Sequence, residues 1–160
     1  MRTTWRSTVV QGLLAGVVGF LTVAIVFAVP NLVAGRSPWY TAALLGAALF
    51  DGASEPATVA VTSANVLSYS AMHLAVFLAF GLIGAGLAAL ADRGWHLWFV
   101  GVFFFLFVSF HLEAAVQAIA APMSAAISPA AIWAAGLGAT ALMGVYILWM
   151  HPRIRARQRW

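Results

Sequence analysis

The residues best able to do chemistry stand in one of the most apolar stretches of this chain. In the segment "SFHLEAAVQ", Ser109, Glu113 and Gln117 follow one another at a spacing of four. Residues four apart share one face of a helix, so a hydroxyl, a carboxyl and an amide are expected to form one polar stripe. Such a stripe can bind the polar head of a ligand or relay a proton.

A second polar stripe lies earlier in the chain, again within an apolar run. Asn65, Tyr69 and His73 also recur at a spacing of four and are expected to share a helix face. Only the short segment "ADRGWH" connects the two apolar runs. We therefore expect the runs to form an antiparallel helical hairpin that brings both stripes onto neighbouring helices.

The hairpin predicts which polar residues lie at the same depth. With the turn near Arg93, level partners have numbers that sum to about 186, which pairs His73 with Glu113 and Tyr69 with Gln117. A carboxyl group in hydrocarbon is expected to hold a proton or to have a cationic partner, since charging it there costs about 2.5–3.5 kcal/mol on insertion scales. His73 offers either solution, so this pair would be able to exchange a proton.

Together the two stripes form the predicted site, which binds a ligand or relays a proton and has no assigned catalytic residue. The alternative is that the polar groups only join helices. Interhelical hydrogen bonds in membranes average about 0.6 kcal/mol, a small return for keeping a carboxyl group there, and this favours a functional site. The predicted members are Asn65, Tyr69, His73, Ser109, Glu113 and Gln117.

His111 is predicted to serve a different face of the same helix. It stands two positions before Glu113 and therefore lies about 200° around the helix from it. One metal shell of His73, His111 and Glu113 is not expected, and no metal site is predicted. His111 instead marks a separate face for a ligand or a partner. The cofactor stays open, with a haem and a quinone as the two candidates.

The composition predicts a membrane protein. Of the 160 residues, 64% are hydrophobic and 8% are charged, against about 45–50% and about 25% in soluble domains. The net charge of +4 comes from arginines that flank the apolar runs, which speaks against a nucleic-acid partner. The chain has no cysteine, no lysine and no HExxH, GxSxG or phosphate-loop motif, so no nucleophile or Schiff base is recognisable.

We predict an all-α integral membrane protein, a bundle of four transmembrane helices plus one short re-entrant or interfacial helix, in a single membrane domain over residues 1–160. A bilayer core of about 30 Å takes about 20 apolar residues to cross, and the run at 38–50 is too short. Ser37-Pro38 and Ser128-Pro129 are helix-start signals. The predicted spans are 8–29, 66–91, 96–121 and 130–150, followed by a basic cytoplasmic tail at 151–160.

The arginines predict the orientation in the membrane. Cytoplasmic loops are enriched in Arg and Lys, and with both termini in the cytoplasm seven arginines lie inside and only Arg36 outside. The predicted location is a cell membrane of the bacterial inner-membrane type. Asp51 and Glu55 then lie outside, as a solvated cap after the short helix instead of a cation site. The alternative, cleavage of the first span as a signal peptide, leaves three spans in the same orientation.

Small residues predict where the helices meet, because close van der Waals packing drives helix association in lipid. At the span ends, histidine and tryptophan side chains predict an interfacial belt. The predicted packing faces carry the Gly12 and Gly16 pair, the Gly81 and Ala85 pair, and the stripe of Gly136, Thr140 and Gly144, each at a spacing of four. The predicted belt consists of Trp95, His96, Trp98, Trp149 and His151.

Three functions fit these features. Small size and short loops favour a subunit or anchor of a larger bioenergetic membrane complex, whose buried polar site binds a haem, a quinone or a partner helix. Its partners would be the lipid bilayer and other membrane subunits or further copies of the chain. The alternative is an oligomeric proton-coupled carrier that uses His73 and Glu113 as a relay. The third is a membrane enzyme with the same two residues as base and acid.

Overall fold

The computed structural model describes residues 5–92, 94, 98–119, 121, 123 and 126–151, and for residues 98, 111–113, 115–117 and 119 it describes the backbone alone. All regular structure in this described part is helical, with no strand. This agrees with the predicted all-α class. The elements are α1 (Trp5–Val33), α2 (Tyr40–Phe50), the short 3-10 turn η1 (Pro56–Thr58), α3 (Ser63–Ala91), α4 (Trp98–Ile119) and α5 (Pro129–Met150).

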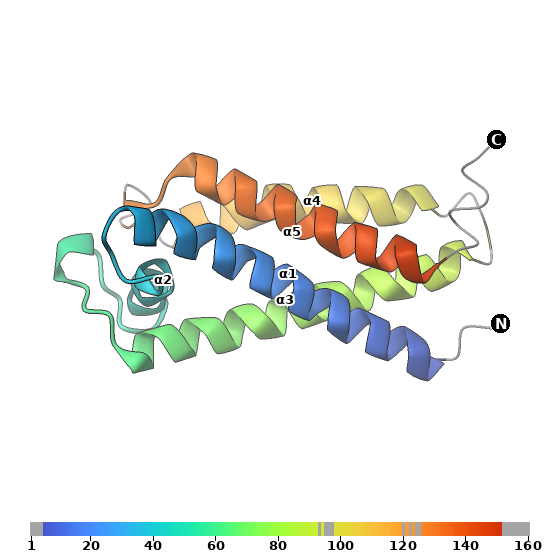
Figure 1. Ribbon diagram of the computed structural model, residues 1–160, viewed down its shortest axis with the longest axis horizontal. Coiled ribbons are helices and arrows are strands. Elements are labelled where there is room, and N and C mark those ends of the chain that lie inside the picture. The colour runs from blue at the N-terminus through green and yellow to red at the C-terminus, as the bar shows by residue number, and fades with distance from the viewer. Residues whose placement is uncertain are drawn as a thin grey trace.

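Four long helices run along the bundle, and the short helix α2 crosses it at one end (Figure 1). At the opposite end α1 begins, α3 ends, α4 begins and α5 ends (Figure 1). We refer to the two ends as the α2 end and the Asp92 end, after the residue that follows α3. Because each long helix runs from one end to the other, neighbours in the chain are antiparallel.

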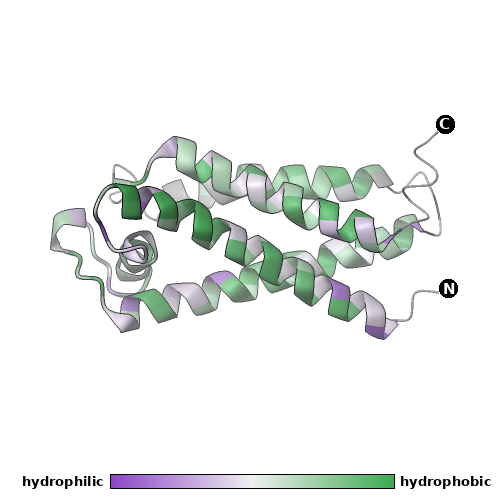
Figure 2. Ribbon diagram, viewed as in Figure 1, coloured by the Kyte–Doolittle hydropathy of each residue, from purple (hydrophilic) through white to green (hydrophobic). Residues whose placement is uncertain are grey.

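Three helices in the described part of the chain are long and apolar enough to cross a membrane. These are α1, α3 and α5, whose most apolar windows have mean hydropathies of 2.6, 2.4 and 1.7. The helix α4 has 22 residues, but its apolar stretch within the described residues, Phe99–Phe110, is shorter than a span. Figure 2 shows hydrophobic residues along the lengths of the long helices and hydrophilic ones mainly near their ends.

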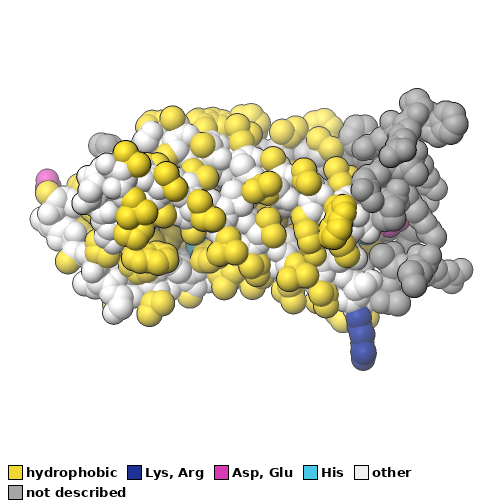
Figure 3. Space-filling view, viewed as in Figure 1, with side chains coloured by type: hydrophobic (Ala, Val, Ile, Leu, Met, Phe, Trp, Pro, Cys, Tyr) yellow, Lys and Arg dark blue, Asp and Glu magenta, His cyan; other side chains and the backbone are white. Residues whose placement is uncertain are grey.

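The outer surface of the bundle carries large apolar side chains. Ile25 is 61% exposed, Phe103 66% and Val145 63%, each on a different long helix. In Figure 3 hydrophobic side chains cover the middle of the visible face, and charged ones appear only near its two ends. Such a surface is suited to hydrocarbon and not to water, since soluble monomers rarely expose large continuous apolar patches.

Close contact between α1 and α3 depends on glycine, as the spacing of small residues predicts. A Cβ atom added to Gly16 would lie 2.6 Å from the carbonyl oxygen of Phe77, and one added to Gly12 would lie 2.7 Å from the Cα of Leu82. A Cβ on Gly81 would collide with the carbonyl oxygen of Gly12. The two backbones therefore touch, and no larger residue fits at this crossing.

The short helix α2 is packed inside the α2 end of the bundle. Six of its eleven residues are buried, including Leu44 and Leu45, and a Cβ on Gly46 would collide with the carbonyl oxygen of Asn65 in α3. A short helix at 38–50 is therefore confirmed. It crosses the bundle axis (Figure 1) and fills space between the ends of α1 and α3.

Helix starts follow the proline signals with small differences. The segment Ser37-Pro38 forms the turn before α2, where the Trp39 N–H donates to the Ser37 hydroxyl oxygen at 3.3 Å and α2 begins at Tyr40. Pro129 is the first residue of α5, as predicted. The helix α1 runs beyond the predicted span to Val33 and includes Pro30 in its last turn, where the proline removes one internal hydrogen bond.

The hairpin of α3 and α4 has the predicted register toward the Asp92 end. The rings of Phe80 and Phe104, whose numbers sum to 184, lie 6.1 Å apart. A Cβ on Gly84 would lie 2.8 Å from the ring of Phe105. At the α2 end, however, α3 and α4 lie on opposite sides of the bundle (Figure 1). The hairpin therefore opens along its length.

Candidate functional site

Tyr69 and His73 form a bonded pair in the first half of α3. The Tyr69 hydroxyl lies 3.4 Å from Nδ1 of His73, and the two rings stack with centroids 5.2 Å apart and planes at 20°. Residues four apart share a helix face, which is what brings the rings together. The expectation that these two residues form one polar stripe is confirmed.

Apolar rings enclose His73. Its ring centroid lies 5.8 Å from that of Phe20 on α1 and 4.8 Å from that of Phe77 on α3. The side chain is buried, and its Nε2 atom has no hydrogen-bond partner within the described structure. A buried nitrogen without a partner costs about 1–3 kcal/mol, so the fold retains His73 at a measurable loss of stability.

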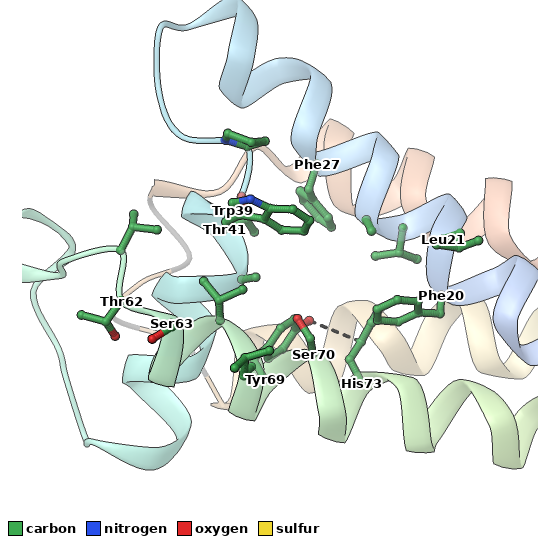
Figure 4. Close-up of a pocket in the computed structure, with 17 residues that line it drawn as sticks. Phe20, Leu21, Phe27, Trp39, Thr41, Thr62, Ser63, Tyr69, Ser70 and His73 are labelled. Carbon is green, nitrogen blue, oxygen red and sulfur yellow. Dashed lines mark hydrogen bonds between the residues drawn. The ribbon is translucent and has the colours of Figure 1, made fainter.

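A pocket of about 670 Å³ lies beside this pair, between α1, α2 and α3. Figure 4 shows Phe20 and Phe27 on α1 facing Tyr69, Ser70 and His73 on α3 across it, with Trp39 at the start of α2. Ligand pockets in proteins commonly have volumes of about 300–1,000 Å³. The pocket is therefore large enough for a small organic molecule.

The pocket wall is apolar and carries no Asp, Glu, Arg or Lys among its 17 described lining residues. Ser70 is a polar exception. Several other hydroxyls of the long helices bond to carbonyl oxygens of their own helix, as Thr22 does to Val18 and Ser68 to Ala64. For Ser70 the described structure contains no such bond, so its hydroxyl is available to a ligand.

The predicted members of the site are only partly brought together. Tyr69 and His73 line the pocket, whereas Asn65 does not; the Asn65 backbone N–H donates to the Thr62 hydroxyl at the start of α3. The side chains of Glu113, Gln117 and His111 lie outside the described residues. Their predicted roles, including the level pairing of Glu113 with His73, stay predictions.

Ser109 lies elsewhere than the hairpin predicts. Its hydroxyl oxygen lies 3.0 Å from that of Thr140 on α5 and 3.1 Å from the Phe105 carbonyl oxygen. The prediction that Ser109 faces the Tyr69 and His73 stripe is therefore wrong. The physical reason is that α3 and α4 diverge toward the α2 end (Figure 1), while α5 stays close enough for the two hydroxyls to satisfy each other.

His151 also departs from its predicted place. As part of an interfacial belt it should be half in water, but it is 1% exposed, and its Nδ1 lies 2.7 Å from Oδ2 of Asp92. The contact joins the end of α3 to the end of α5. Trp149 is 64% exposed, which agrees with the exposure expected of a residue in an interfacial belt. Trp95 and His96 lie outside the described residues, and so does the side chain of Trp98.

Asp51 and Glu55 have the exposure expected of a solvated cap after the short helix. Asp51 follows α2 as its C-cap, and its backbone N–H donates to the Ala47 carbonyl oxygen. Both Asp51 and Glu55 are exposed. Within the described residues no group of three or more His, Asp or Glu side chains could hold a metal ion.

Two polar contacts escaped the sequence reasoning. The first is the Asp92–His151 pair, which no spacing rule could reveal because its partners lie on helices far apart in the chain. The second is the buried bond of 2.9 Å from the Asn31 amide to the Thr41 hydroxyl, which joins the end of α1 to α2. It was detectable in principle as an amide at the end of an apolar run.

Among the lining residues, Ser70 and the α1 phenylalanines were also missed. Ser70 precedes His73 by three positions, a spacing that shares a helix face as well as four does. Phe20 and Phe27 are seven apart, two turns along one face of α1. Both spacings are visible in the sequence, but the sequence does not indicate that α1 packs against the first half of α3.

Compared with known proteins, the chain matches no family model, no curated protein and no solved structure.

Proposed function

We propose that this chain is a four-span membrane protein with both termini in the cytoplasm, that it serves as a subunit or anchor of a larger membrane complex, and that it holds a ligand beside His73. The observation that carries the proposal is the buried His73 ring, whose Nε2 lacks a partner in the described structure and which lines a pocket of about 670 Å³. Ionisable residues within membrane helices are functional candidates by default.

The depth of His73 supports this assignment. The residue lies ten positions after Ser63, where α3 begins, which is about 15 Å along the helix. If α3 enters the membrane near its first residue, His73 is close to the middle of a hydrocarbon core about 30 Å thick. A polar side chain at that depth has no water to bond with, and its position on the wall of a pocket favours a role in ligand binding over simple packing.

Four spans fit the arrangement of the helix ends. The start of α1 and the end of α5 lie at the same end of the bundle (Figure 1), as an even number of crossings requires. The helix α4 would be the fourth span, because it runs the length of the bundle beside α5 (Figure 1). The arginine distribution then favours the cytoplasm for the Asp92 end.

An exposed aromatic face on α4 supports the role of a subunit. Phe103, Phe107 and Phe110 are 66%, 58% and 59% exposed and follow one another at spacings of four and three. They therefore form one ridge along α4. Such a ridge offers van der Waals contacts to the helix of another subunit, which is the interaction that joins helices in lipid.

The carrier alternative has less support from the geometry. A path through the bundle would have to pass from the pocket toward the Asp92 end. Between α1 and α3 the backbones touch at Gly12, Gly16 and Gly81, which leaves no room for a solute there. For the enzyme alternative, the described residues contain no group of three or more His, Asp or Glu side chains that could hold a metal ion.

Purification of the tagged protein from its native membrane in a mild detergent tests the proposal. We expect a native mass that is not a whole multiple of the chain's own mass, and a bound ligand detectable by absorption or by mass spectrometry. The ligand should be lost from the His73→Leu variant and kept in a control, Val145→Leu, on the exposed face of α5. A ligand-free homo-oligomer of the unaltered protein would contradict the proposal and favour the carrier.

A further inference from the structure

We propose that the pocket between α1, α2 and α3 takes a lipid-soluble molecule with a flat, uncharged ring that bears carbonyl or hydroxyl groups, the chemical class of quinones. The inference rests on the proposed function, since it names the class of ligand held beside His73. Three features of the pocket carry it: its aromatic walls, its lack of fixed charge, and its free hydroxyl.

The walls are suited to a flat ring. Five of the 17 described lining residues have aromatic ring side chains: Phe20, Phe27, Trp39, Tyr69 and His73. They come from α1 and α3 on opposite sides and from the start of α2 (Figure 4). Aromatic faces and edges pack against another ring in stacked or edge-on arrangements. A branched or purely aliphatic ligand could not make these stacked or edge-on ring contacts.

The polar groups are suited to an uncharged head. No lining residue offers a cation to a phosphate or to a carboxylate, so a phospholipid head group or the propionates of a haem would enter without a counter-ion. Ser70 has a hydroxyl with no bond in the described structure, and it can donate to a carbonyl oxygen of a ring or accept from a ring hydroxyl.

Haem ligation fits the same residues poorly. A haem iron requires an imidazole nitrogen that faces the cavity. In His73 one nitrogen, Nδ1, lies within hydrogen-bond distance of the Tyr69 hydroxyl. The other, Nε2, has no appreciable surface open to a water-sized molecule. A ring that stacks beside the imidazole needs neither nitrogen to be exposed.

The mouth of the pocket is open to the surface that would face lipid. Leu21 on α1 is 49% exposed and Leu67 on α3 is 66% exposed, and both line the pocket. Trp39 at the start of α2 is 55% exposed. The ring would enter laterally between α1 and α3, and its apolar tail would remain among these exposed side chains and the acyl chains of the bilayer.

Quenching of tryptophan fluorescence by a benzoquinone with a decyl tail tests the inference, with the full chain in phospholipid nanodiscs. We expect saturable quenching that depends on Trp39 and is largely lost in Trp39→Phe. Ala24→Phe fills the pocket wall and should weaken binding about tenfold or more. Ser70→Ala removes the free hydroxyl and should weaken it about fivefold.

The matched control is Ile25→Phe, which adds a ring to the neighbouring residue, 61% exposed and outside the pocket lining, and should bind like the unaltered chain. Decanol has the tail without the ring and should not compete. Equal binding by Ala24→Phe and the unaltered chain would overturn the inference, as would full competition by decanol.

Analysis of the lipids that co-purify with the unaltered chain separates this inference from the proposed function. A ring-bearing neutral lipid that is absent from Ala24→Phe supports both. A bound phospholipid or haem that is absent from His73→Leu keeps the ligand site and overturns the quinone class. No bound ligand at all, with no quenching, overturns both.

Discussion

Two histidines of this chain are buried in opposite ways. His151 has a carboxylate partner, with its Nδ1 2.7 Å from Asp92, at the end of the bundle. His73 has only the Tyr69 hydroxyl, at 3.4 Å, and is otherwise surrounded by phenylalanine rings and the pocket. The first arrangement joins two helix ends. In both residues Nε2 is buried without a partner in the described structure, but only His73 lines the pocket between α1, α2 and α3, and this difference is why His73 is assigned to ligand binding.

A pair of variants measures the Tyr69–His73 contact. In Tyr69→Phe, Nδ1 of His73 is left buried without a partner, so we expect the free energy of unfolding in detergent to fall by about 1–3 kcal/mol. In the double variant Tyr69→Phe, His73→Phe, both polar groups are replaced by rings, and most of that loss should be recovered. A double variant less stable than Tyr69→Phe would show that the polar contact is not what matters at this position.

At the scale of elements, the crossing of α1 and α3 determines the shape of the pocket. The helices touch at Gly12, Gly16 and Gly81 and separate toward the α2 end (Figure 1). The helix α2 fills part of the space between the separating helices. The unfilled part of that space is the pocket. A bulkier residue at the crossing would push the helices apart and change the distance between Phe20 and His73.

Gly81→Ala tests the crossing. The added Cβ would collide with the backbone of α1, and such overpacking costs about 1–3 kcal/mol, so the melting temperature in detergent should fall. The control is Gly86→Ala, also in α3, where an added Cβ meets nothing within 4 Å. An equal melting temperature for both variants would mean that the close approach of the helices does not stabilise the bundle.

The sequence was sufficient for the elements and insufficient for their arrangement. Apolar runs and proline signals predict the helices and the short helix near 38–50, and the Gly12 and Gly16 pair predicts close helix packing without saying which helix is the partner. The Ser109 bond to Thr140 was not predictable, because it depends on how far α3 and α4 diverge, which is a property of tertiary packing. Ser70 was missed because its role depends on which face of α3 meets α1.

At the scale of the whole molecule, the proposed function requires that the chain cross the membrane four times. The long helices alternate in direction, and the beginning of α1 and the end of α5 share one end of the bundle (Figure 1). Three crossings would place those two points on opposite sides of a membrane. The orientation further requires that the loop with Asp51 and Glu55 lies outside the cytoplasm, since seven of the eight arginines fall on the other side.

The most direct measurement is the labelling of single cysteines in intact cells, which is clean here because the chain has no cysteine of its own. We expect a membrane-impermeant maleimide to label Glu55→Cys in intact cells and to label Thr3→Cys and Arg157→Cys only after the membrane is opened. Labelling of Arg157→Cys in intact cells while Thr3→Cys stays protected would mean an odd number of crossings. Labelling of all three in intact cells would contradict the account of a membrane-spanning protein altogether.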